Sequence, residues 1–282
     1  GRALMKTILV DPSLCIQCCD CQIACKDEHC DNDWSPLAAP QEEGQFWIQV
    51  RERQVASGSR MRQERVPVMC QQCEDAPCIA AAQAAGYPEA AYRRDDGIVI
   101  FDTERARGCH ELMDACPYGV VYWNDVLDLP QKCTMCAHLL DAGWGRPRCV
   151  AACPRDALRF VDTSELTPQN MYAPLERLHS EYGTNPTVAY VNMPKPFIAG
   201  EVYSPVEDRC LDGVTVTLEN EATLQKWETK TDYFGEFRVE DISDGYYTLL
   251  LEKEGYEDKR IERLHVSGAL NAGSIVLYAT PC

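Results

Sequence analysis

Cysteines in short, regular spacings are the residues of this chain best suited to chemistry. In the strongest motif, Cys15-x2-Cys18-x2-Cys21-x3-Cys25, three thiolates wrap one [4Fe–4S] cluster and the fourth reaches a neighbouring cluster. Thiolate is a soft ligand that matches cluster iron. A zinc site uses four ligands, usually as two pairs, and this run is too compressed for that arrangement. The motif therefore predicts iron–sulfur clusters.

A second group combines two cysteine pairs across a long, irregular gap. Its members are Cys133, Cys136, Cys149 and Cys153, the last followed by a proline. Taken alone, these four cysteines could hold zinc. Beside the first motif, an iron–sulfur site is the favoured interpretation.

Two further groups are incomplete. The third group is Cys70-x2-Cys73-x4-Cys78. Ala82 stands where its fourth cysteine would follow. The fourth group retains Cys116 before a proline and Cys109, while Ala106 and Leu112 occupy the other two positions. These replacements predict that one cluster of a four-group set is missing.

Short structural units must position these cysteines. Residues 116–123 and residues 153–160 repeat each other: in both, Cys-Pro opens a tight turn that leads into a short strand with apolar residues. Repetition of a whole unit indicates duplicated ferredoxin-type modules. We therefore expect an α+β, ferredoxin-like iron–sulfur domain over residues 1–162.

The pattern changes beyond residue 162. Residues 163–196 hold four prolines and one helix-like stretch, which indicates a connecting segment. From residue 197 to 282, short strands of period two separated by turn signals predict an all-β sandwich of seven strands. The expected strands are 197–203, 214–218, 225–231, 236–239, 246–252, 259–265 and 274–278. The stretch 231–237, followed by Gly-Tyr-Tyr at 245–247, resembles prealbumin-like (Cna-B-like) modules.

Composition limits the partners and the compartment. A net charge of −17 argues against nucleic acid, because phosphate binding needs clustered Lys and Arg. No apolar run approaches the roughly 18 residues of a membrane span, and no secretory signal is evident. We therefore expect a soluble, cytoplasmic chain, although export on a partner's signal would leave no trace here. Seventeen cysteines in such a chain do not indicate disulfides, since the cytosol keeps thiols reduced.

Four cysteine groups in this order resemble the four-cluster electron-transfer subunits of the dimethyl sulfoxide reductase family. In that family the outer two groups pair and the middle two groups pair, each exchanging a fourth cysteine. For the first cluster the resemblance implies Cys15, Cys18, Cys21 and Cys153. For the second it implies Cys133, Cys136, Cys149 and Cys25. For the third it implies Cys70, Cys73, Cys78 and Cys116. A fourth cluster would need Ala82, Ala106, Cys109 and Leu112, so it cannot form.

The missing cluster and the prealbumin-like module narrow the resemblance to family members that act on phenols, of the transhydroxylase or hydroxylase/dehydroxylase type. Residues 132–141, 116–120 and 233–237 carry it. It implies three [4Fe–4S] clusters, no catalytic residue on this chain, and a heterodimer with a large catalytic subunit. That subunit would hold molybdenum with two pyranopterins, and a higher-order oligomer of heterodimers is compatible. The alternatives are a subunit of a quinone-linked respiratory molybdenum reductase, or a binding protein with zinc sites.

The remaining cysteines and the histidines near the cysteine groups need no ligand role. We expect Cys109, Cys210 and Cys282 to behave as small buried hydrophobes. The histidines near the groups are expected to pack or to form hydrogen bonds, because no cluster lacks a ligand; they are His29, His110 and His138.

Overall fold

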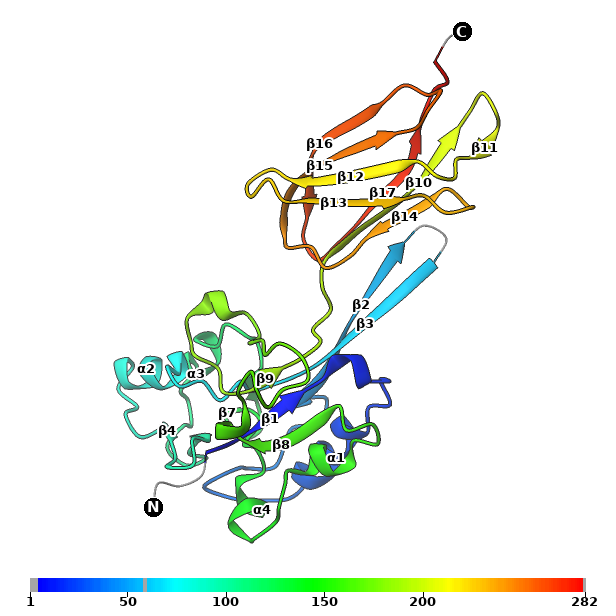
Figure 1. Cartoon of the computed structure of the whole chain (residues 1–282). Helices are drawn as coiled ribbons and strands as arrows, with labels where there is room; N and C mark the ends of the chain where they lie inside the picture. The colour runs from blue at the N-terminus through cyan, green and yellow to red at the C-terminus, as the bar shows by residue number, and fades with distance from the viewer. Residues whose placement is uncertain (1–4, 58–59, 281–282) are drawn as a thin grey trace. The chain divides into compact units, whose positions relative to one another are not determined.

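The computed structural model describes residues 5–57 and 60–280, and the side chains of 54–62 are outside the description (Figure 1). The chain divides into two compact units, Gly1–Glu52 with Arg65–Met193, and Arg53–Glu64 with Pro194–Cys282. The first unit combines short helices with small sheets, and the second is built from strands. An α+β domain followed by an all-β domain was the sequence-based expectation, and the architecture agrees with this fold class.

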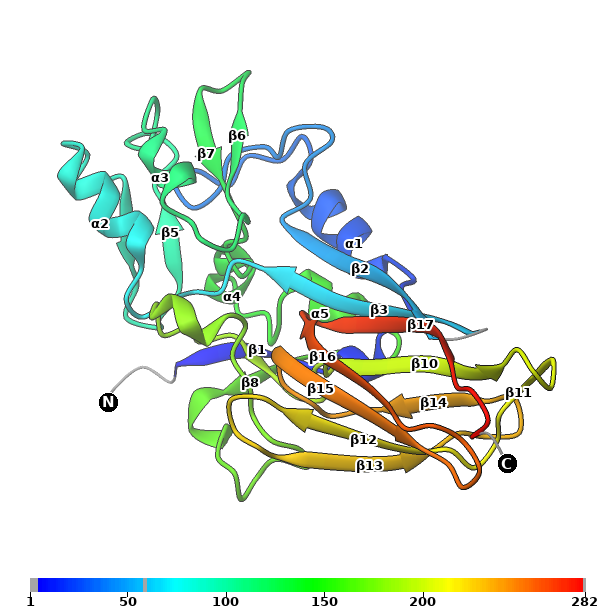
Figure 2. The same cartoon turned by 90° about the horizontal axis from the view of Figure 1, so that it is seen from above.

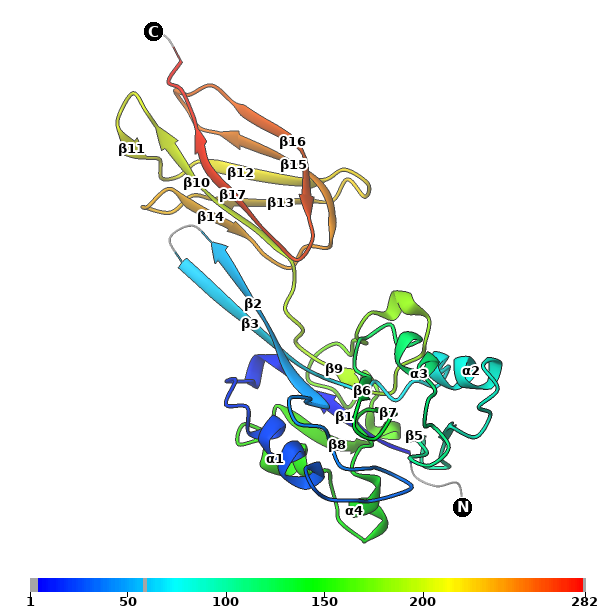
Figure 3. The ribbon, with the colours of Figure 1, turned by 180° about the vertical axis from the view of Figure 1, so that it is seen from behind.

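A three-stranded sheet lies at the centre of the first unit. Its middle strand is β1 (Lys6–Val10), which pairs antiparallel with β8 (Leu158–Asp162) and parallel with β9 (Ala189–Tyr190) (Figure 3). Ile8 and Tyr190 of this sheet are fully buried in the same apolar core as six of the cysteines, with two more packed against it. Burial of these strands thus fixes the segments that follow β1 and precede β8, which contain cysteines.

The segment expected to connect the domains, residues 163–196, is integral to the first unit up to Met193. It supplies β9, and Val188 and Tyr190 are fully buried. The Tyr190 hydroxyl accepts from Gln71 Nε2 and donates to the Pro67 carbonyl, both at 3.2 Å. Three of the four prolines that indicated a linker therefore belong to a strap, residues 163–193, that packs on the core around the cysteines.

Short helices and hairpins complete this part of the chain. The helices are η1 (Pro12–Leu14), α1 (Asp20–His29), α2 (Pro77–Ala84), α3 (Glu111–Asp114), α4 (Ala137–Asp141), α5 (Arg148–Ala152), η2 (Thr163–Glu165) and η3 (Ser180–Tyr182). The hairpins are β2 (Ile48–Ser57) with β3 (Arg60–Met69), β4 (Ala91–Arg93) with β5 (Val99–Phe101), and β6 (Tyr122–Asn124) with β7 (Leu129–Gln131). α1 and α4 each begin after a cysteine in the left-handed conformation, Cys19 and Cys136. The cysteine groups thus lie partly in the loops before these helices and partly in the helices themselves, as Cys21 and Cys25 do in α1.

Two four-stranded sheets form the sandwich of the second unit (Figure 2), and the part of the β2–β3 hairpin within Arg53–Glu64 also belongs to this unit. One contains β10 (Phe197–Ser204), β11 (Arg209–Cys210), β14 (Glu236–Val239) and β17 (Ala269–Val276). The other contains β12 (Thr215–Asn220), β13 (Lys226–Lys230), β15 (Gly245–Glu252) and β16 (Lys259–Val266). Both sheets contribute to one apolar core, with Ile198 and Phe237 from the first and Leu218 and Leu249 from the second. The period-two pattern arises because each strand turns one face to this core.

Six of the seven expected strands occur with shifts of at most two residues at their ends, whereas the last, expected at 274–278, begins five residues earlier as β17 (Ala269–Val276). The described part of the sandwich has an eighth strand, β11. The sequence did not predict it, because two residues are too few to show a period-two pattern. Cys210 lies in β11 and is exposed, so the expectation of a buried small hydrophobe is wrong for it. An edge strand of two residues leaves its side chains at the surface. Cys282 lies outside the described residues.

Within the described ranges, no helix is both long enough and apolar enough to cross a bilayer.

Candidate metal centres

The central sheet brings the first and last cysteine groups together. β1 leads through η1 into Cys15, and β8 follows the turn that contains Cys153. Antiparallel pairing sets Val10 opposite Leu158, so both cysteines lie at the same end of the sheet. Residues separated by almost the length of the first unit therefore meet.

A cavity with an empty volume of about 330 Å³ lies at this end of the sheet. The cysteines that line it are Cys15, Cys18, Cys19, Cys21 and Cys153. Four of them are the set that the family resemblance implies for one cluster. The fifth, Cys19, directs its Sγ to the Gln17 carbonyl at 3.6 Å, and the preference for Cys18 as ligand stays a prediction. Cys18 is exposed, which places this first site near the surface.

A similar cavity, of about 340 Å³, lies between α2 and the turn that contains Cys116. Its cysteines are Cys70, Cys73, Cys78 and Cys116, and apolar residues form most of the remaining wall. Proline at the first position of α2 suits a helix start, because its missing N–H would have no partner there. Both cavities are lined by four cysteines of one proposed ligand set, which fits occupants of one kind.

The middle site joins α1 to α5 and to the loop before α4. Its cysteines are Cys25, Cys133, Cys136 and Cys149, each between 5% and 8% exposed. Burial raises the pKa of the Cys149 thiol well above its ordinary value, and the nearby Cys136, Cys133 and Cys25 thiols raise it further. Mutual repulsion of this kind requires the four sulfur atoms to be close neighbours.

Raised thiol pKa values are common to the three sites. Burial and neighbouring cysteines raise the pKa of Cys21 and of Cys136 to about 12, and that of Cys73 to about 11. A thiol must lose its proton to bind a metal. Four thiolates in one buried place are stable only beside positive charge, which cluster iron supplies. The donor set and its burial therefore fit [4Fe–4S] clusters.

Lys132 supports an anionic occupant of the third site. Its side chain is 2% exposed and lines the 340 Å³ cavity. Nζ donates to the carbonyl oxygens of Val99 and Cys133 and lies 4.9 Å from the centre of the Phe101 ring. No carboxylate of the described residues forms an ion pair with it. A buried cation is costly unless an anion compensates it, and a thiolate-bound cluster would do so.

Cysteines of the first and third sites lie near those of the middle site. Cys21 of the first site raises the pKa of Cys25 and Cys149 in the middle site. Cys70 of the third site raises the pKa of Cys133 in the middle site. Each site thus has a neighbour close enough for its charge to act. Within the described residues, no three His, Cys, Asp or Glu side chains converge closely enough to hold a single metal ion.

The four positions that would bind a fourth cluster in the family form an apolar core. Each of the four side chains has no exposed surface, and they are Ala82, Ala106, Cys109 and Leu112. Phe101 and Val121 pack in the same group, against which Cys78 and Cys116 also lie. The Cys109 sulfur lies 3.6 Å from a carboxylate oxygen of Glu111, and burial of Cys109 as a small hydrophobe is confirmed.

The histidines have the packing and hydrogen-bonding roles expected of them. His110 stacks on Trp123 with 3.7 Å between ring centres, and His138 Nε2 lies 3.0 Å from Glu28 Oε1. His29 directs Nε2 to Cys136 Sγ at 3.9 Å. The role of Lys132 was missed from the sequence. Its position directly before Cys133 was the only available signal, and nothing local distinguishes a buried lysine from an exposed one.

Comparisons with known proteins agree with this geometry. Residues 61–163 match the 4Fe–4S dicluster domain, and residues 198–277 match the carboxypeptidase regulatory-like domain. The pyrogallol hydroxytransferase small subunit of Pelobacter acidigallici is 34% identical over 259 residues, 88% of this chain and 90% of its own. The thiosulfate reductase electron transfer subunit PhsB of Salmonella typhi is 36% identical over 161 residues, 56% of this chain and 78% of its own.

Buried cysteine groups in a dicluster domain define an iron–sulfur protein that transfers electrons. A putative iron–sulfur subunit of dimethyl sulfoxide reductase from Halobacterium salinarum is also similar, at 31% identity over 66% of this chain and 78% of its own. The chain belongs to the iron–sulfur electron-transfer subunits of molybdenum oxidoreductases in the dimethyl sulfoxide reductase family.

Proposed function

We propose that this chain binds three [4Fe–4S] clusters and passes single electrons to or from a molybdenum bis-pyranopterin held by a large subunit that acts on phenolic aromatics. The observation that carries the proposal is the pairing of three cysteine quartets with an apolar core at the fourth position. Twelve thiolates supply four ligands to each of three clusters. No residue of the chain is assigned a catalytic role.

The ligand sets are those implied by the family. The first cluster takes Cys15, Cys18, Cys21 and Cys153. The second takes Cys133, Cys136, Cys149 and Cys25. The third takes Cys70, Cys73, Cys78 and Cys116. Each cluster supplies one-electron redox chemistry when bound, and its potential depends on burial, charge and hydrogen bonds to sulfur. Among the residues near the third site, the Lys132 cation favours the more negative, reduced state.

The choice of a phenolic substrate rests on how far the similarity extends. The pyrogallol hydroxytransferase subunit aligns with 88% of this chain, whereas the thiosulfate reductase subunit aligns with 56%. The longer alignment reaches into the second unit, for which we propose a prealbumin-like fold and a binding or spacing role. A transhydroxylase needs no net electrons, so the clusters would there set the oxidation state of the metal. In a hydroxylase or dehydroxylase they would carry electrons in every turnover.

We assign the complex to the cytoplasm, because seventeen cysteines need a reducing compartment. Purification from the native source, with metal analysis and low-temperature EPR, tests the proposal. We expect a much larger molybdenum-containing partner and about twelve iron atoms per copy of this chain, four in each cluster. A stable monomer that converts a phenol unaided would contradict the proposal. So would a colourless protein with zinc, or a partner that anchors the complex to a membrane quinone pool.

A further inference from the structure

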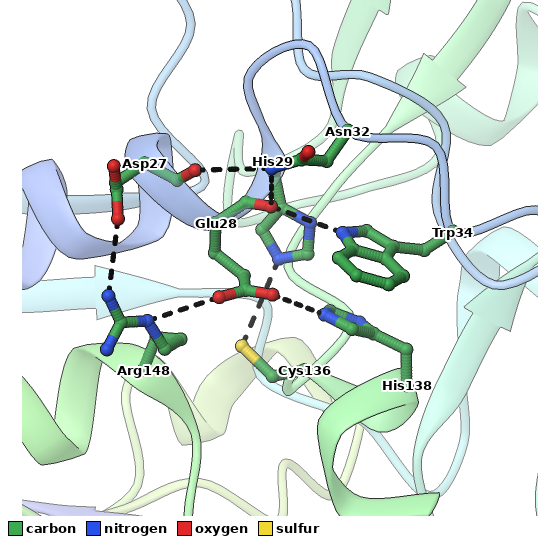
Figure 4. Close-up of polar contacts among 8 residues, drawn as sticks. All are labelled: Asp27, Glu28, His29, Asn32, Trp34, Cys136, His138 and Arg148. Carbon is green, nitrogen blue, oxygen red and sulfur yellow. Dashed lines mark hydrogen bonds and ion pairs between the residues drawn. The ribbon is translucent and has the colours of Figure 1, made fainter. Parts of the chain in front are cut away.

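A histidine points at one sulfur of the middle site. His29 is the last residue of α1 and is 1% exposed. Its Nε2 lies 3.9 Å from Cys136 Sγ, and Figure 4 shows the ring directed from α1 toward the cysteine that precedes α4. Cys136 is one of the four ligands proposed for the second cluster. The contact therefore joins a residue outside the ligand set to a ligand sulfur.

The proton of the imidazole can be assigned to Nε2. An imidazole carries a proton on at least one of its two ring nitrogens, whatever its charge. A cysteine that ligates iron has no proton and can only accept a hydrogen bond. If Nε2 lacked the proton, two lone pairs would face each other across the contact. The Nδ1 atom is buried and has no hydrogen-bond partner among the described residues, so a proton there would be an unpaired donor.

Packing on both sides fixes the direction of the ring. The Trp47 ring centre lies 4.6 Å from that of His29, and His138 meets it edge-on at 5.2 Å. Trp34 stacks on His138 at 4.4 Å, and its indole N–H donates to the Glu28 carbonyl (Figure 4). Packed neighbours of this kind leave the imidazole little freedom to turn away from the sulfur.

A carboxylate holds the outer part of this arrangement. Glu28 Oε1 lies 3.0 Å from His138 Nε2, and Glu28 Oε2 lies 3.1 Å from Arg148 Nε. Arg148 begins α5, which carries Cys149, another proposed ligand of the same cluster. The charged groups that face the histidine pair are thus tied to each other and leave Cys136 as the acceptor for His29.

We propose that His29 donates its Nε2–H to the Cys136 sulfur and thereby makes the middle cluster easier to reduce than it would be without this bond. The proposal rests on the function proposed above. A hydrogen bond to a ligand sulfur stabilises the reduced cluster, because the reduced state places more negative charge on sulfur. His29 is a positioning and tuning residue: it touches the ligand and transfers no electron itself.

Two substitutions in the complete complex test the proposal. His29→Leu removes the donor and replaces the ring with an apolar side chain. His29→Gln can present an amide N–H near the position of Nε2. We expect the midpoint potential of one cluster to fall in His29→Leu and to return most of the way in His29→Gln. The other two clusters should keep their potentials. Redox titration followed by low-temperature EPR, with iron analysis of each variant, gives these values.

A matched control and a measurement on the unaltered protein separate tuning from packing. Trp47→Phe loosens the packing on His29 but leaves the Nε2–H donor of His29 in place. The midpoint potential of the middle cluster should therefore stay close to that of the parent. Pulsed EPR of protein labelled with ¹⁵N-histidine should detect one histidine nitrogen coupled to the reduced middle cluster. This coupling should be absent from His29→Gln.

Failure of this proposal differs from failure of the proposed function. About twelve irons in His29→Leu with an unshifted potential, or no histidine coupling in the unaltered protein, would overturn the role of His29 alone. Equal shifts in His29→Leu and Trp47→Phe would also overturn it. Fewer than three clusters in the unaltered protein would instead contradict the proposed function.

Discussion

At the scale of single residues, two cysteines that are close in the sequence have opposite surroundings. Cys116 lines the cavity of the third site together with three other cysteines. Cys109 has no exposed surface and packs among Ala82, Ala106 and Leu112, none of which can bind iron. A cysteine therefore binds a cluster only where other cysteines lie close enough to share the iron, and its residue type alone does not decide this.

Substitution of each cysteine by alanine tests this difference. Cys116→Ala should damage the third cluster and leave a three-iron form or about eight irons per chain, whereas the parent holds about twelve. Cys109→Ala should keep about twelve, with at most a small loss of stability from a shortened buried side chain. Iron analysis and low-temperature EPR decide. Sixteen irons in the parent, or a cluster lost with Cys109 but not with Cys116, would disprove the assignment.

The ligand groups could be predicted from the sequence because cysteine spacing is a local property. The neighbours that adjust the sites could not. The Cys136 sulfur is contacted by His29 of α1, which is distant in the chain. Lys132 is adjacent to Cys133, yet its burial depends on Val99 and Phe101 in another hairpin. Such contacts arise from tertiary packing and leave no periodic trace.

At the scale of elements, one carboxylate fastens the strap over residues 163–193 to the central sheet. Asp11 follows β1 and is 2% exposed. Tyr172 donates its hydroxyl proton to Asp11 Oδ2 at 2.5 Å, and Asn192 Nδ2 donates at 3.0 Å. Burial alone would raise the pKa of Asp11, but hydrogen bonds from Ser13, Tyr172 and Asn192 outweigh it and lower the pKa. Their stabilisation is complete above the ordinary pKa near 3.9 and is lost as the pH falls through the lowered value.

Removal of this carboxylate should loosen the strap without removing iron. Hydrogen bonds to a charged group contribute roughly 1.5–3 kcal/mol, so in Asp11→Ala the amides of 189–191 should exchange hydrogen about tenfold faster or more. Hydrogen–deuterium exchange at neutral pH measures this. Asp162→Ala is the control, because Asp162 accepts the same local bonds from a serine two residues on. Equal protection of 189–191 in all three proteins would refute the role of Asp11.

Strands of the second unit were predictable, whereas β9 was not. β12 alternates buried and half-buried residues over its whole length, which is the signal that a period-two search detects. β9 has two residues and owes its existence to pairing with β1. Four prolines in the same segment indicated a linker, because the local sequence does not record that Tyr190 reaches a buried partner, Gln71.

At the scale of the whole molecule, the two units have separate cores. The apolar group around the cysteines contains residues up to Met193, and the sandwich group begins at Ile198. All twelve proposed ligands lie in the first unit. Cluster binding should therefore not depend on the sandwich.

Truncation after Met193 tests this separation. The shortened chain, produced with its large subunit, should keep about twelve irons per folded copy. Iron content alone does not report whether the complex is intact, so the affinity of the shortened chain for the large subunit is measured in parallel. If truncation has an effect, we expect it to lower this affinity. Iron content and size-exclusion chromatography of both lengths provide the comparison. Loss of about four irons on truncation would show that a residue beyond 193 binds a cluster.

The apolar core at the fourth position makes the loss of that site hard to reverse by single steps. A cubane needs four ligands, and Cys109 is the one that remains. Cysteine at position 82 or 106 would enlarge a fully packed side chain, and cysteine at 112 would leave a gap where leucine was. Each step costs stability, and no four-iron cluster can form until the third is made. Evolution by successive point mutations therefore meets a barrier here, and a lineage that has filled this site with hydrocarbon keeps it filled.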